Sequence, residues 1–331
     1  MKKRLLSGMR PTGSLHLGHL VGALNNWVKL QEKYECFFMI ADWHALMSEY
    51  ENPKSIEKNS IEMLADWIAC GIDPEKSTIF VQSHIKEHLE LDMVLSCITP
   101  LGMLERNPTY KEQLRELKGR HITTYGFLGY PVLQAADILV YKGQAVPVGV
   151  DQAAHLELAR EIVRKFNNLY GKLFPEPETM LDKSTPRLKG LDGRKMSNSY
   201  NNFIALSDSP ETIKKKVTKM ITDEKKIHKD DYGHPNVCNV FYYYMHTFRP
   251  ERSKEIHDPC LKGKRGCVEC KKELAEILIN KLEPIREKKE LLLGDKAVLF
   301  DMLKKGARKA REVASVTMKE VREKVGVFHD L

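Results

Sequence analysis

Two short motifs, far apart in the sequence, hold the residue types best suited to chemistry on phosphate groups. His16-Leu17-Gly18-His19 lies near the start of the chain, and Lys195-Met196-Ser197-Asn198-Ser199 lies past its middle. Two histidines three residues apart in a first helical turn project towards the same side, where they can donate to charge that develops on a phosphate. His-x-x-His can also ligate a metal, although no third ligand lies nearby, and a solvated turn is the simplest alternative. For this motif alone the phosphate and the structural interpretations stay equally open.

The second motif follows Gly193-Arg194, so the whole segment is glycine-led, basic and rich in hydroxyl groups. Such a loop can close over a triphosphate, because its lysine offsets negative charge and its serines donate hydrogen bonds. An ordinary surface loop can have the same composition. The two motifs together, in this order, indicate chemistry at the phosphates of ATP more strongly than either motif does alone.

The residues around the first motif alternate between strand and helix patterns. Buried strands are predicted at residues 4–8, 35–43, 78–82 and 145–149, and helices at residues 17–33, 55–70, 88–97 and 153–170. This order predicts a parallel, Rossmann-like sheet with helices on both faces. The first motif then lies between the first strand and the first helix, where parallel α/β folds bind phosphate on the N–H groups of a helix N-terminus.

After Tyr200 strand patterns become scarce and helical patterns dominate. Ser209-Pro210 combines a hydroxyl cap with a proline at the first helical position, which predicts a helix start. Apolar residues at helical spacing predict further helices over 274–285 and 298–325. We therefore predict a Rossmann-like catalytic domain over residues 1–195 and an all-helical domain over residues 196–331.

The net charge of the 331-residue chain is +8, and its distribution is uneven. Residues 201–331 hold 28 lysines and arginines against 21 acidic residues, so +7 of the +8 lies there. A basic helical domain suits a polyanionic partner such as RNA, although a solvated lysine-rich surface is the simpler alternative. Apolar runs are too short to span a membrane, and the basic start is followed by only Leu5-Leu6, which is no signal peptide. We expect a cytoplasmic protein.

The seven cysteines fall into two groups. Three lie in apolar segments, as reduced core thiols do: Cys36, Cys70 and Cys97. Four lie in the helical part, enough thiolates to close a zinc or an iron–sulfur site: Cys238, Cys260, Cys267 and Cys270. Zinc sites usually combine two Cys-x2-Cys units, and only one is present. The uneven spacing therefore favours a 4Fe-4S cluster over zinc, with free thiols as the third alternative.

The two motifs resemble the signatures of class I aminoacyl-tRNA synthetases. Over nearly its whole length the chain more closely resembles the bacterial tryptophanyl-tRNA synthetase family. The segments that carry this resemblance are Ser-Gly-Met-Arg-Pro-Thr-Gly at 7–13, Ala-Asp-Trp-His-Ala at 41–45, Tyr-Pro-Val-Leu-Gln-Ala-Ala-Asp-Ile-Leu at 130–139 and Val-Pro-Val-Gly-Val-Asp-Gln at 146–152. The resemblance implies a Rossmann-like catalytic domain, a helical anticodon-binding domain and a homodimer. It also implies activation of tryptophan by ATP to tryptophanyl-adenylate, followed by transfer to the terminal adenosine of tRNA(Trp).

The resemblance also assigns residues to a tryptophan site. An indole ring needs apolar walls and one acceptor for its N–H group. Asp137 lies in an apolar run, where a carboxylate is costly unless it is paired. A helix cap or an internal salt bridge would explain it, but the resemblance makes it the indole acceptor. The implied walls are Tyr130, Gln134, Val146 and Val148. His44 and Gln152 would place the amino and carboxylate groups, and Gly8 would leave room.

The same resemblance implies an ATP site in which catalysis consists of alignment and charge stabilisation. The residues implied in catalysis are His16, His19, Lys111, Lys195 and Ser197. No general base is needed, because a carboxylate is already a nucleophile, and Mg²⁺ would be held mainly by substrate oxygens. The residues implied to contact ATP are Arg10, Pro11, Thr12, Gly18, His19, Gly149, Val150, Asp151, Leu188, Lys195, Met196, Ser197, Asn198 and Ser199. Among these, Asp151 would bind the ribose.

Three positions depart from the family pattern. Asn198 stands where a second loop lysine is usual, so one cationic contact is missing or is supplied elsewhere, with Arg194 as a candidate. Val150 replaces a usual glutamate, and Arg10 replaces a glutamine beside the implied ATP site. We expect ATP to bind all the same, with Arg10 offsetting phosphate charge.

The four late cysteines resemble those of a subset of this family that carries a 4Fe-4S cluster near the anticodon site, with a first gap one residue shorter. Three alternatives to a tryptophan enzyme stay open. A tyrosyl-tRNA synthetase shares the fold, and Asp137 could also serve a phenol. A non-charging paralogue that senses amino acid or binds tRNA is consistent with Asn198 and Val150. A plain nucleotidyltransferase shares the histidine motif, but the basic helical domain argues against it.

Overall fold

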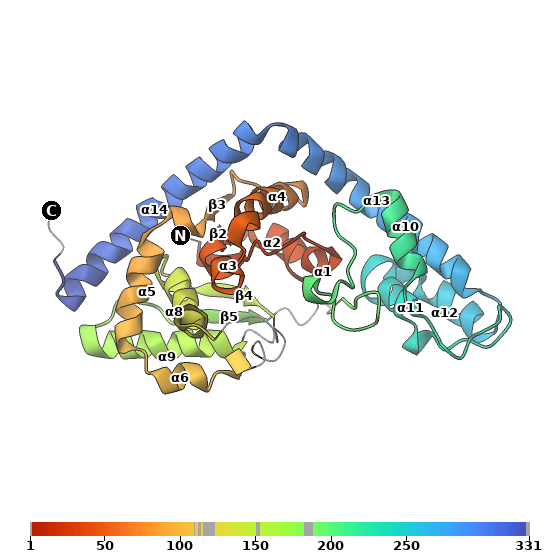
Figure 1. Ribbon diagram of the computed structural model, residues 1–331, viewed down its shortest axis with the longest axis horizontal. Helices are drawn as coiled ribbons and strands as arrows, with labels where there is room; N and C mark the ends of the chain where they lie inside the picture. Colours follow the sequence, from red (N-terminus) through yellow and green to blue (C-terminus); the bar gives the residue numbers. More distant parts are fainter. Residues whose placement is uncertain are drawn as a thin grey trace.

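The computed structural model describes residues 2–108, 110–111, 114, 123–149, 153–181 and 188–328. At its centre is a sheet of five parallel strands in the order β3-β2-β1-β4-β5 (Figure 1). The strands are β1 (Arg4–Met9), β2 (Glu35–Ile40), β3 (Ser77–Val81), β4 (Ala145–Val148) and β5 (Glu178–Leu181). This sheet confirms the predicted Rossmann-like fold. Its order reverses between β1 and β4, so their carboxyl ends flank the crevice in which such folds bind ligands.

Apolar side chains alternate along the strands and supply a core on each face of the sheet. Leu5 and Phe38 belong to one core, while Leu6 and Phe37 belong to the other. The first face is covered by α1 (Leu17–His19), α2 (Asn25–Leu30) and α4 (Ile56–Ala69). The second face is covered by α5 (Glu87–Ile98), α8 (Tyr125–Leu139) and α9 (Ala153–Tyr170), with the short α6 (Leu101–Glu105) beside α8. Strands covered on both faces are apolar throughout, which explains why the pattern predicted them.

Two predicted elements differ in detail. The strand predicted over 35–43 ends at Ile40, and α3 (Asp42–Glu49) begins two residues later. Asp42 stabilises this early helix start, because its Oδ1 atom accepts the backbone N–H groups of Trp43 and Ser83, each at 3.0 Å. The helix predicted over 17–33 is present but contains a π-helical stretch, Leu20–Leu24, between α1 and α2. Such stretches often lie near functional sites.

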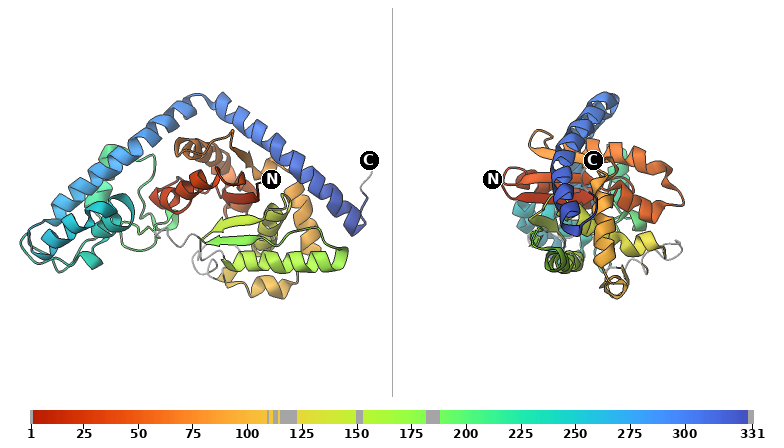
Figure 2. Two further views of the ribbon diagram at one scale, coloured as in Figure 1. Left: turned by 180° about the vertical axis from the view of Figure 1, so that it is seen from behind. Right: turned by 90° about the vertical axis from the view of Figure 1, so that its left-hand side faces the viewer.

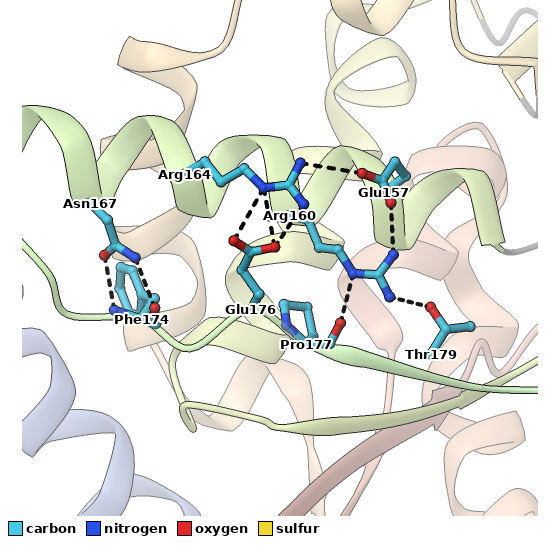
Figure 3. Close-up of polar contacts among 8 residues, drawn as sticks. All are labelled: Glu157, Arg160, Arg164, Asn167, Phe174, Glu176, Pro177 and Thr179. Carbon is cyan, nitrogen blue, oxygen red and sulfur yellow. Dashed lines mark hydrogen bonds and ion pairs between the residues drawn. The ribbon is translucent and has the colours of Figure 1, made fainter.

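Polar contacts from α9 hold the segment that leads into β5, an edge strand that the sequence did not predict. Arg160 donates to the carbonyl oxygen of Pro177 at 2.9 Å and to Thr179 Oγ1 at 2.5 Å (Figure 3). Arg164 pairs with Glu176 at 2.7 Å. Four residues are too few to show the alternation of a strand, so these contacts rather than local propensity fix its place.

The chain beyond residue 200 forms a helical unit, as predicted. α13 (Cys267–Gly294) packs with α10 (Pro210–Thr218) and α11 (Asn239–Tyr243), and α12 (Ser253–Leu261) packs on α11. Ser209 caps α10, with its Oγ atom accepting the N–H of Thr212 at 3.2 Å, which confirms the predicted helix start. Among the residues that the structure describes, no helix combines the length and apolar character needed to cross a membrane.

The two longest helices meet at an angle, so that α14 (Lys296–Val325) turns back from the helical unit over the sheet (Figures 1 and 2). There it covers the edge strand β3 and adds Ala310, Ala314 and Met318 to the core shared with α5. Gly306 permits this close contact, because a Cβ atom there would collide with the carbonyl oxygen of Ile79 on β3. Part of the C-terminal region therefore packs on the sheet, and the domain boundary near residue 195 stays a prediction.

A buried ion pair joins α13 to the sheet domain. Lys289 Nζ lies 2.9 Å from Asp66 Oδ2 on α4, and the two side chains are 8% and 2% exposed. Burial raises the pKa of Asp66 to about 6, and the charge of Lys289 opposes this rise. Removal of either member would leave the other charge buried alone, so the pair favours one placement of α13 on α4.

Candidate active site

The first predicted motif forms the N-terminus of α1. His16 caps this helix: its Nδ1 atom accepts the N–H of Gly18 at 3.1 Å, and its own N–H donates to His19 Nδ1 at 3.2 Å. The two rings stack with their centres 3.8 Å apart. A Cβ atom on Gly18 would lie only 2.9 Å from the His16 ring, so the stack requires glycine there. The motif is therefore a compact unit that the local backbone holds in place.

Both histidines of this motif are neutral. Burial lowers the pKa of His16 to about 3 and that of His19 to about 4, and the closeness of His19 lowers the pKa of His16 further. Because each Nδ1 atom accepts a backbone N–H, each neutral ring carries its proton on Nε2. The motif thus offers two neutral N–H donors that an anionic ligand can use.

The second motif lies on a loop whose shape is fixed by one buried side chain. Asn202 accepts the N–H of Ser197 at 2.9 Å and donates to Asp192 Oδ1 at 2.7 Å. Met196 is buried beneath the loop, whereas Lys195 is exposed on it. The backbone of the motif is therefore organised although its lysine faces solvent.

The structure brings the two motifs together. The N–H of Gly18 lies 3.3 Å from Met196 Sδ. A Cβ atom on Gly13, in the loop before the first motif, would lie 3.1 Å from Asn198 Nδ2. The segment that follows the second motif also pairs by backbone hydrogen bonds with residues 15–17. Residues far apart in sequence thus lie in contact just beyond the carboxyl end of β1.

The cationic groups of the second loop are not equivalent. Arg194 Nε donates to Asp192 Oδ2 at 2.6 Å, and its guanidinium lies 4.6 Å from the centre of the Tyr200 ring. This arginine is already paired, so it is a poor replacement for the lysine that is absent at position 198. Asn198 itself is partly buried, and its Oδ1 atom has no hydrogen-bond partner among the described residues.

Asp137 lies on α8 at the centre of a buried polar network. Its Oδ1 atom accepts from Gln82 Nε2 at 2.7 Å and from His88 Nδ1 at 2.6 Å, and its Oδ2 atom accepts from His44 Nε2 at 2.9 Å. His88 Nε2 lies 2.7 Å from the hydroxyl of Tyr141. Asp137 lies inside α8, whose N-cap is Thr124, so it does not cap the helix; it is 1% exposed, and its contacts with His44 and His88 are the internal pairing that the sequence left open.

These hydrogen bonds keep Asp137 ionised. Burial by itself raises the pKa of this carboxyl, but the bonds from His44 and His88 outweigh that effect and lower the pKa of Asp137 to about 2. An ionised carboxylate only accepts hydrogen bonds, so His44 carries a proton on Nε2 and His88 carries one on Nδ1. Burial also raises the pKa of Tyr141, whose hydroxyl lies beside the other ring nitrogen of His88.

Tyr130 and Gln134 lie on the same face of α8 as Asp137, at helical spacing. The Tyr130 hydroxyl lies 2.5 Å from His155 Nε2 on α9, while Gln134 is partly exposed. Burial raises the pKa of Tyr130, and the charge of Arg10 opposes this rise, so Arg10 acts on this side of the crevice. The three α8 side chains and Arg10 therefore belong to one neighbourhood.

The other predicted residues occupy varied positions. Gly8 is required by strand packing, because a Cβ atom there would lie 2.7 Å from the carbonyl oxygen of Met39 on β2. Val146 is buried in the core, and Val148 is partly buried at the end of β4. Pro11 and Leu188 are buried, and the exposed residues are Thr12, Lys111, Gly149 and Ser199. Val150, Asp151 and Gln152 lie outside the described residues.

Sequence reasoning missed four residues that support the predicted ones. Gln82 and His88 contact Asp137, and Tyr141 contacts His88. His155 contacts Tyr130. Their only signal is a polar group within an apolar segment. A histidine on an apolar helix face is usually a satisfied core residue, so the pattern cannot tell which ones adjoin a site.

The four late cysteines line one small cavity in the helical unit, together with Arg265. Burial raises the pKa of Cys260 to about 11, and Arg265 Nε donates to Cys270 Sγ at 3.0 Å. Within the described ranges, no group of three or more His, Cys, Asp or Glu side chains is placed to hold a metal ion. The predicted ligands are thus gathered around a shared cavity, but they do not form a ligand shell.

Comparisons with known proteins agree with this architecture. The family model described as "tRNA synthetases class I (W and Y)" matches residues 1–283. The tryptophan–tRNA ligase of Thermotoga maritima is 49% identical over 98% of this chain and 99% of its own length. That of Aquifex aeolicus is 44% identical over 97% of this chain and 98% of its own. The crystal structure of tryptophanyl-tRNA synthetase from Campylobacter jejuni, complexed with ADP and tryptophan, superposes with a TM-score of 0.89 at 37% identity, covering 98% of this chain and 100% of its own.

The fold and the two joined motifs, with these matches, place the chain in the class I aminoacyl-tRNA synthetases for tryptophan and tyrosine. The full-length relatives then decide between the two amino acids. The chain belongs to the tryptophan–tRNA ligases, which confirms the predicted function and enzyme class and sets the tyrosine alternative aside.

Proposed function

We propose that the crevice between the two motifs and the Asp137 network binds tryptophan and ATP and charges tRNA(Trp). The remaining acceptor position on Asp137 carries this proposal. A carboxylate offers about four lone-pair positions on its two oxygens. Oδ1 accepts two protein donors and Oδ2 accepts one, so one position on Oδ2 is left. A single acceptor in a buried setting is what the indole N–H group requires.

The same network explains selection. Asp137 is ionised, and a ligand without a donor would leave its last lone pair unpaired in a buried site, which disfavours that ligand strongly. His44, which we expected to place the polar end of the substrate, is better suited to orient Asp137. In this proposal Tyr130, Gln134, Val146 and Val148 form the walls, while Gly8 and Gln152 adjoin the amino and carboxylate groups.

In the activation step, a carboxylate oxygen of tryptophan attacks the α-phosphorus of ATP, and the bond to pyrophosphate breaks. No proton is transferred. His16 and His19 donate from Nε2 to the reacting phosphate, while Lys195, Lys111 and Ser197 stabilise the leaving pyrophosphate. Bound Mg²⁺ would supply further charge neutralisation on the phosphate oxygens. The remaining ATP contacts are those implied by the sequence, with Arg10 beside the nucleotide and Asp151 on its ribose.

In the transfer step, a hydroxyl of the terminal adenosine of tRNA attacks the carbonyl carbon of the adenylate. A new ester bond forms, the bond to AMP breaks, and the hydroxyl proton passes to the departing phosphate. The protein contributes mainly alignment in this step, because the adenylate is already activated.

ATP–pyrophosphate exchange tests the assignment of Asp137. We expect exchange with tryptophan, none with tyrosine, and at least about 1,000-fold lower kcat/KM with the benzothiophene analogue, which keeps the shape of indole but lacks its N–H. Equal rates with tryptophan and the analogue would show that Asp137 Oδ2 does not receive the indole. Exchange with tyrosine would refute the pocket assignment as a whole.

For the four-cysteine cavity we propose a structural 4Fe-4S cluster, with zinc as the alternative. The four thiols line a common space, and their uneven spacing in the sequence, with a single Cys-x2-Cys unit, favours a four-iron group over zinc. When bound, the cluster would cross-link α11, α12 and α13 through its iron–sulfur bonds. Arg265 would hydrogen-bond one ligand sulfur and offset its charge.

Metal analysis separates these alternatives. Anaerobically purified protein should be brown and contain stoichiometric iron and sulfide, and Cys267→Ser should lose both. Arg265→Gln should retain the cluster but lose it faster in air. Colourless protein with one zinc per chain would refute the cluster, and protein without either metal would leave the cysteines as free thiols.

We also propose a homodimer in the cytoplasm. Leu89 and Met93, one turn apart on α5, are 40% and 64% exposed, and Tyr125 at the start of the adjoining α8 is 77% exposed. Apolar side chains left in solvent on packed helices are typical of an interface. Light scattering should give twice the mass of the chain, and Met93→Glu should shift it towards the monomer, while an unchanged dimer would place the interface elsewhere.

A further inference from the structure

A basic groove lies on the outer side of the sheet domain, where α14 passes the end of β3. It is lined by His84 from the turn after β3, and by Lys304, Arg308, Arg311, Glu312 and Ser315 from α14. In Figure 1 this half of α14 runs past β3 towards α5. The groove is separate from the crevice that holds the two motifs, and none of its side chains has a part in the activation step.

The helix that carries most of the groove packs tightly on the sheet. Gly306 lets α14 rest directly on the backbone of Ile79, and Arg311 donates to the carbonyl oxygen of His84. Ala310 and Ala314, on the inner side of α14, are fully buried. The cationic side chains on the outer side are therefore carried by a helix that is fixed to the sheet at several points.

The charge of the groove is largely uncompensated. Lys304 and Arg308 are exposed, lie four residues apart on one helix face, and have no hydrogen-bond or ion-pair partner among the described residues. Lys305 next to them differs, because it pairs with Asp301 at 2.9 Å. Between Lys296 and Val325 the sequence holds nine lysines and arginines against four acidic residues, a net charge of +5. Much of the basic excess of the chain is therefore on this helix, against the sheet, rather than in the helical unit.

The groove also faces the functional end of the sheet. It opens at the carboxyl end of β3, the same end at which a parallel α/β sheet binds its ligands. His84 and Gln82 belong to one short turn, Gln82–His84. Gln82 donates inward to Asp137, while His84 lines the groove on the outside. One turn thus separates the amino-acid pocket from the basic surface.

We propose that this groove binds backbone phosphates of the acceptor arm of tRNA, an inference that rests on the proposed charging of tRNA. Unpaired cations at helical spacing suit successive phosphates without reading sequence, and Ser315 adds a hydroxyl donor. The acceptor arm is the fitting part, because its end must reach the crevice at this end of the sheet. Glu312 is the one acidic lining residue, so it limits affinity.

Charging kinetics of the full-length protein test the proposal. In Lys304→Ala with Arg308→Ala, we expect kcat/KM for tRNA to fall about 10- to 30-fold. The slope of log Kd for tRNA against log salt should decrease in magnitude by about 2. Glu312→Gln should tighten tRNA binding roughly twofold to threefold. Exchange of pyrophosphate into ATP with tryptophan, which requires no tRNA, should stay at the wild-type rate in both variants.

The matched control is Lys319→Ala with Lys324→Ala, which removes the same charge from exposed positions of α14 beyond the groove. The proposal is wrong if the groove variant and this control have the same kcat/KM and salt slope for tRNA. It is also wrong if the groove variant instead fails to hold a protein partner while binding tRNA normally. Failure of the wild-type protein to charge tRNA at all would overturn the proposed function, whatever the groove does.

Discussion

The indole end and the phosphate end of the candidate active site are built differently. Asp137, at the indole end, already has three protein partners and is 1% exposed. At the phosphate end, Lys195 is exposed on its loop, and Asn198 Oδ1 is buried without a partner among the described residues. In the proposed site, the group that selects the amino acid is therefore positioned by the protein's own side chains, whereas the phosphate end holds an exposed lysine and a buried amide oxygen. The following changes test this contrast.

Loss of the preformed carboxylate should have the largest effect. In Asp137→Ala we expect kcat/KM for tryptophan to fall about 10,000-fold in pyrophosphate exchange, because the indole N–H loses its partner and three protein donors are left unpaired. The KM for ATP should change little, because the nucleotide end is separate. Circular dichroism controls for folding. Equal increases in the KM for tryptophan and in the KM for ATP would mean that the indole end and the phosphate end are not independent.

Removal of the exposed loop cation should come next. In Lys195→Ala we expect kcat to fall roughly 100- to 1,000-fold, because one stabilising charge on the leaving pyrophosphate disappears. The KM for tryptophan and the melting temperature should stay close to the wild type, since the side chain faces solvent. A large drop in melting temperature would show that this lysine is structural rather than held for ATP.

The neutral histidine pair should make the free energy of unfolding decrease at acidic pH. Because the pKa of His16 is about 3 in the folded chain, below its ordinary value of 6.5, the folded state binds fewer protons than the unfolded state over this range. Neutral His16 contributes its full share to the free energy of unfolding above pH 6.5. This share is lost as the pH falls towards 3, and the loss is roughly 3 kcal/mol near pH 4. His16→Asn keeps a capping side chain but removes the titration. Urea unfolding of both proteins from pH 7 to pH 4 should therefore show a shallower decline for the variant, and parallel declines would contradict the neutral state.

The smallest change should come from restoring the second loop lysine. In Asn198→Lys we expect kcat/KM for ATP to rise roughly threefold, because a cation is added at the end of the site that awaits charge. Asn198→Gln, which lengthens the side chain without charge, is the control. A tenfold loss in the lysine variant would show instead that the amide is needed beside Gly13.

The parts of the fold that the sequence predicted are those with strong local patterns. The apolar strands β1 to β4 and the helix over 153–170 are present close to the predicted residues, because burial on both faces leaves a continuous apolar signal. The strand β5 was missed, since its position depends on Arg160 and Arg164 of another element. The return of α14 to β3 was missed too, because Gly306 shows its purpose only beside Ile79.

The candidate site divides in the same way. The two motifs and Asp137 were recognisable from residue type and family resemblance. Gln82, His88 and Tyr141 were not, because a long-range hydrogen bond leaves no spacing pattern in the chain. The pairing of Arg194 with Asp192 likewise depends on the shape of a loop, and it removed a cation that the sequence left available.

The contact of Gly306 with Ile79 has a consequence for synthesis of the chain. β3 is complete after residue 81, yet the helix that covers its open edge begins only at Lys296, so that helix leaves the ribosome long after the strand. Until that helix emerges, the nascent sheet therefore presents an uncovered strand edge, which can pair with other chains. A chain that stops before α14 should contain all five strands and still aggregate, because the helix that covers the edge of β3 is missing.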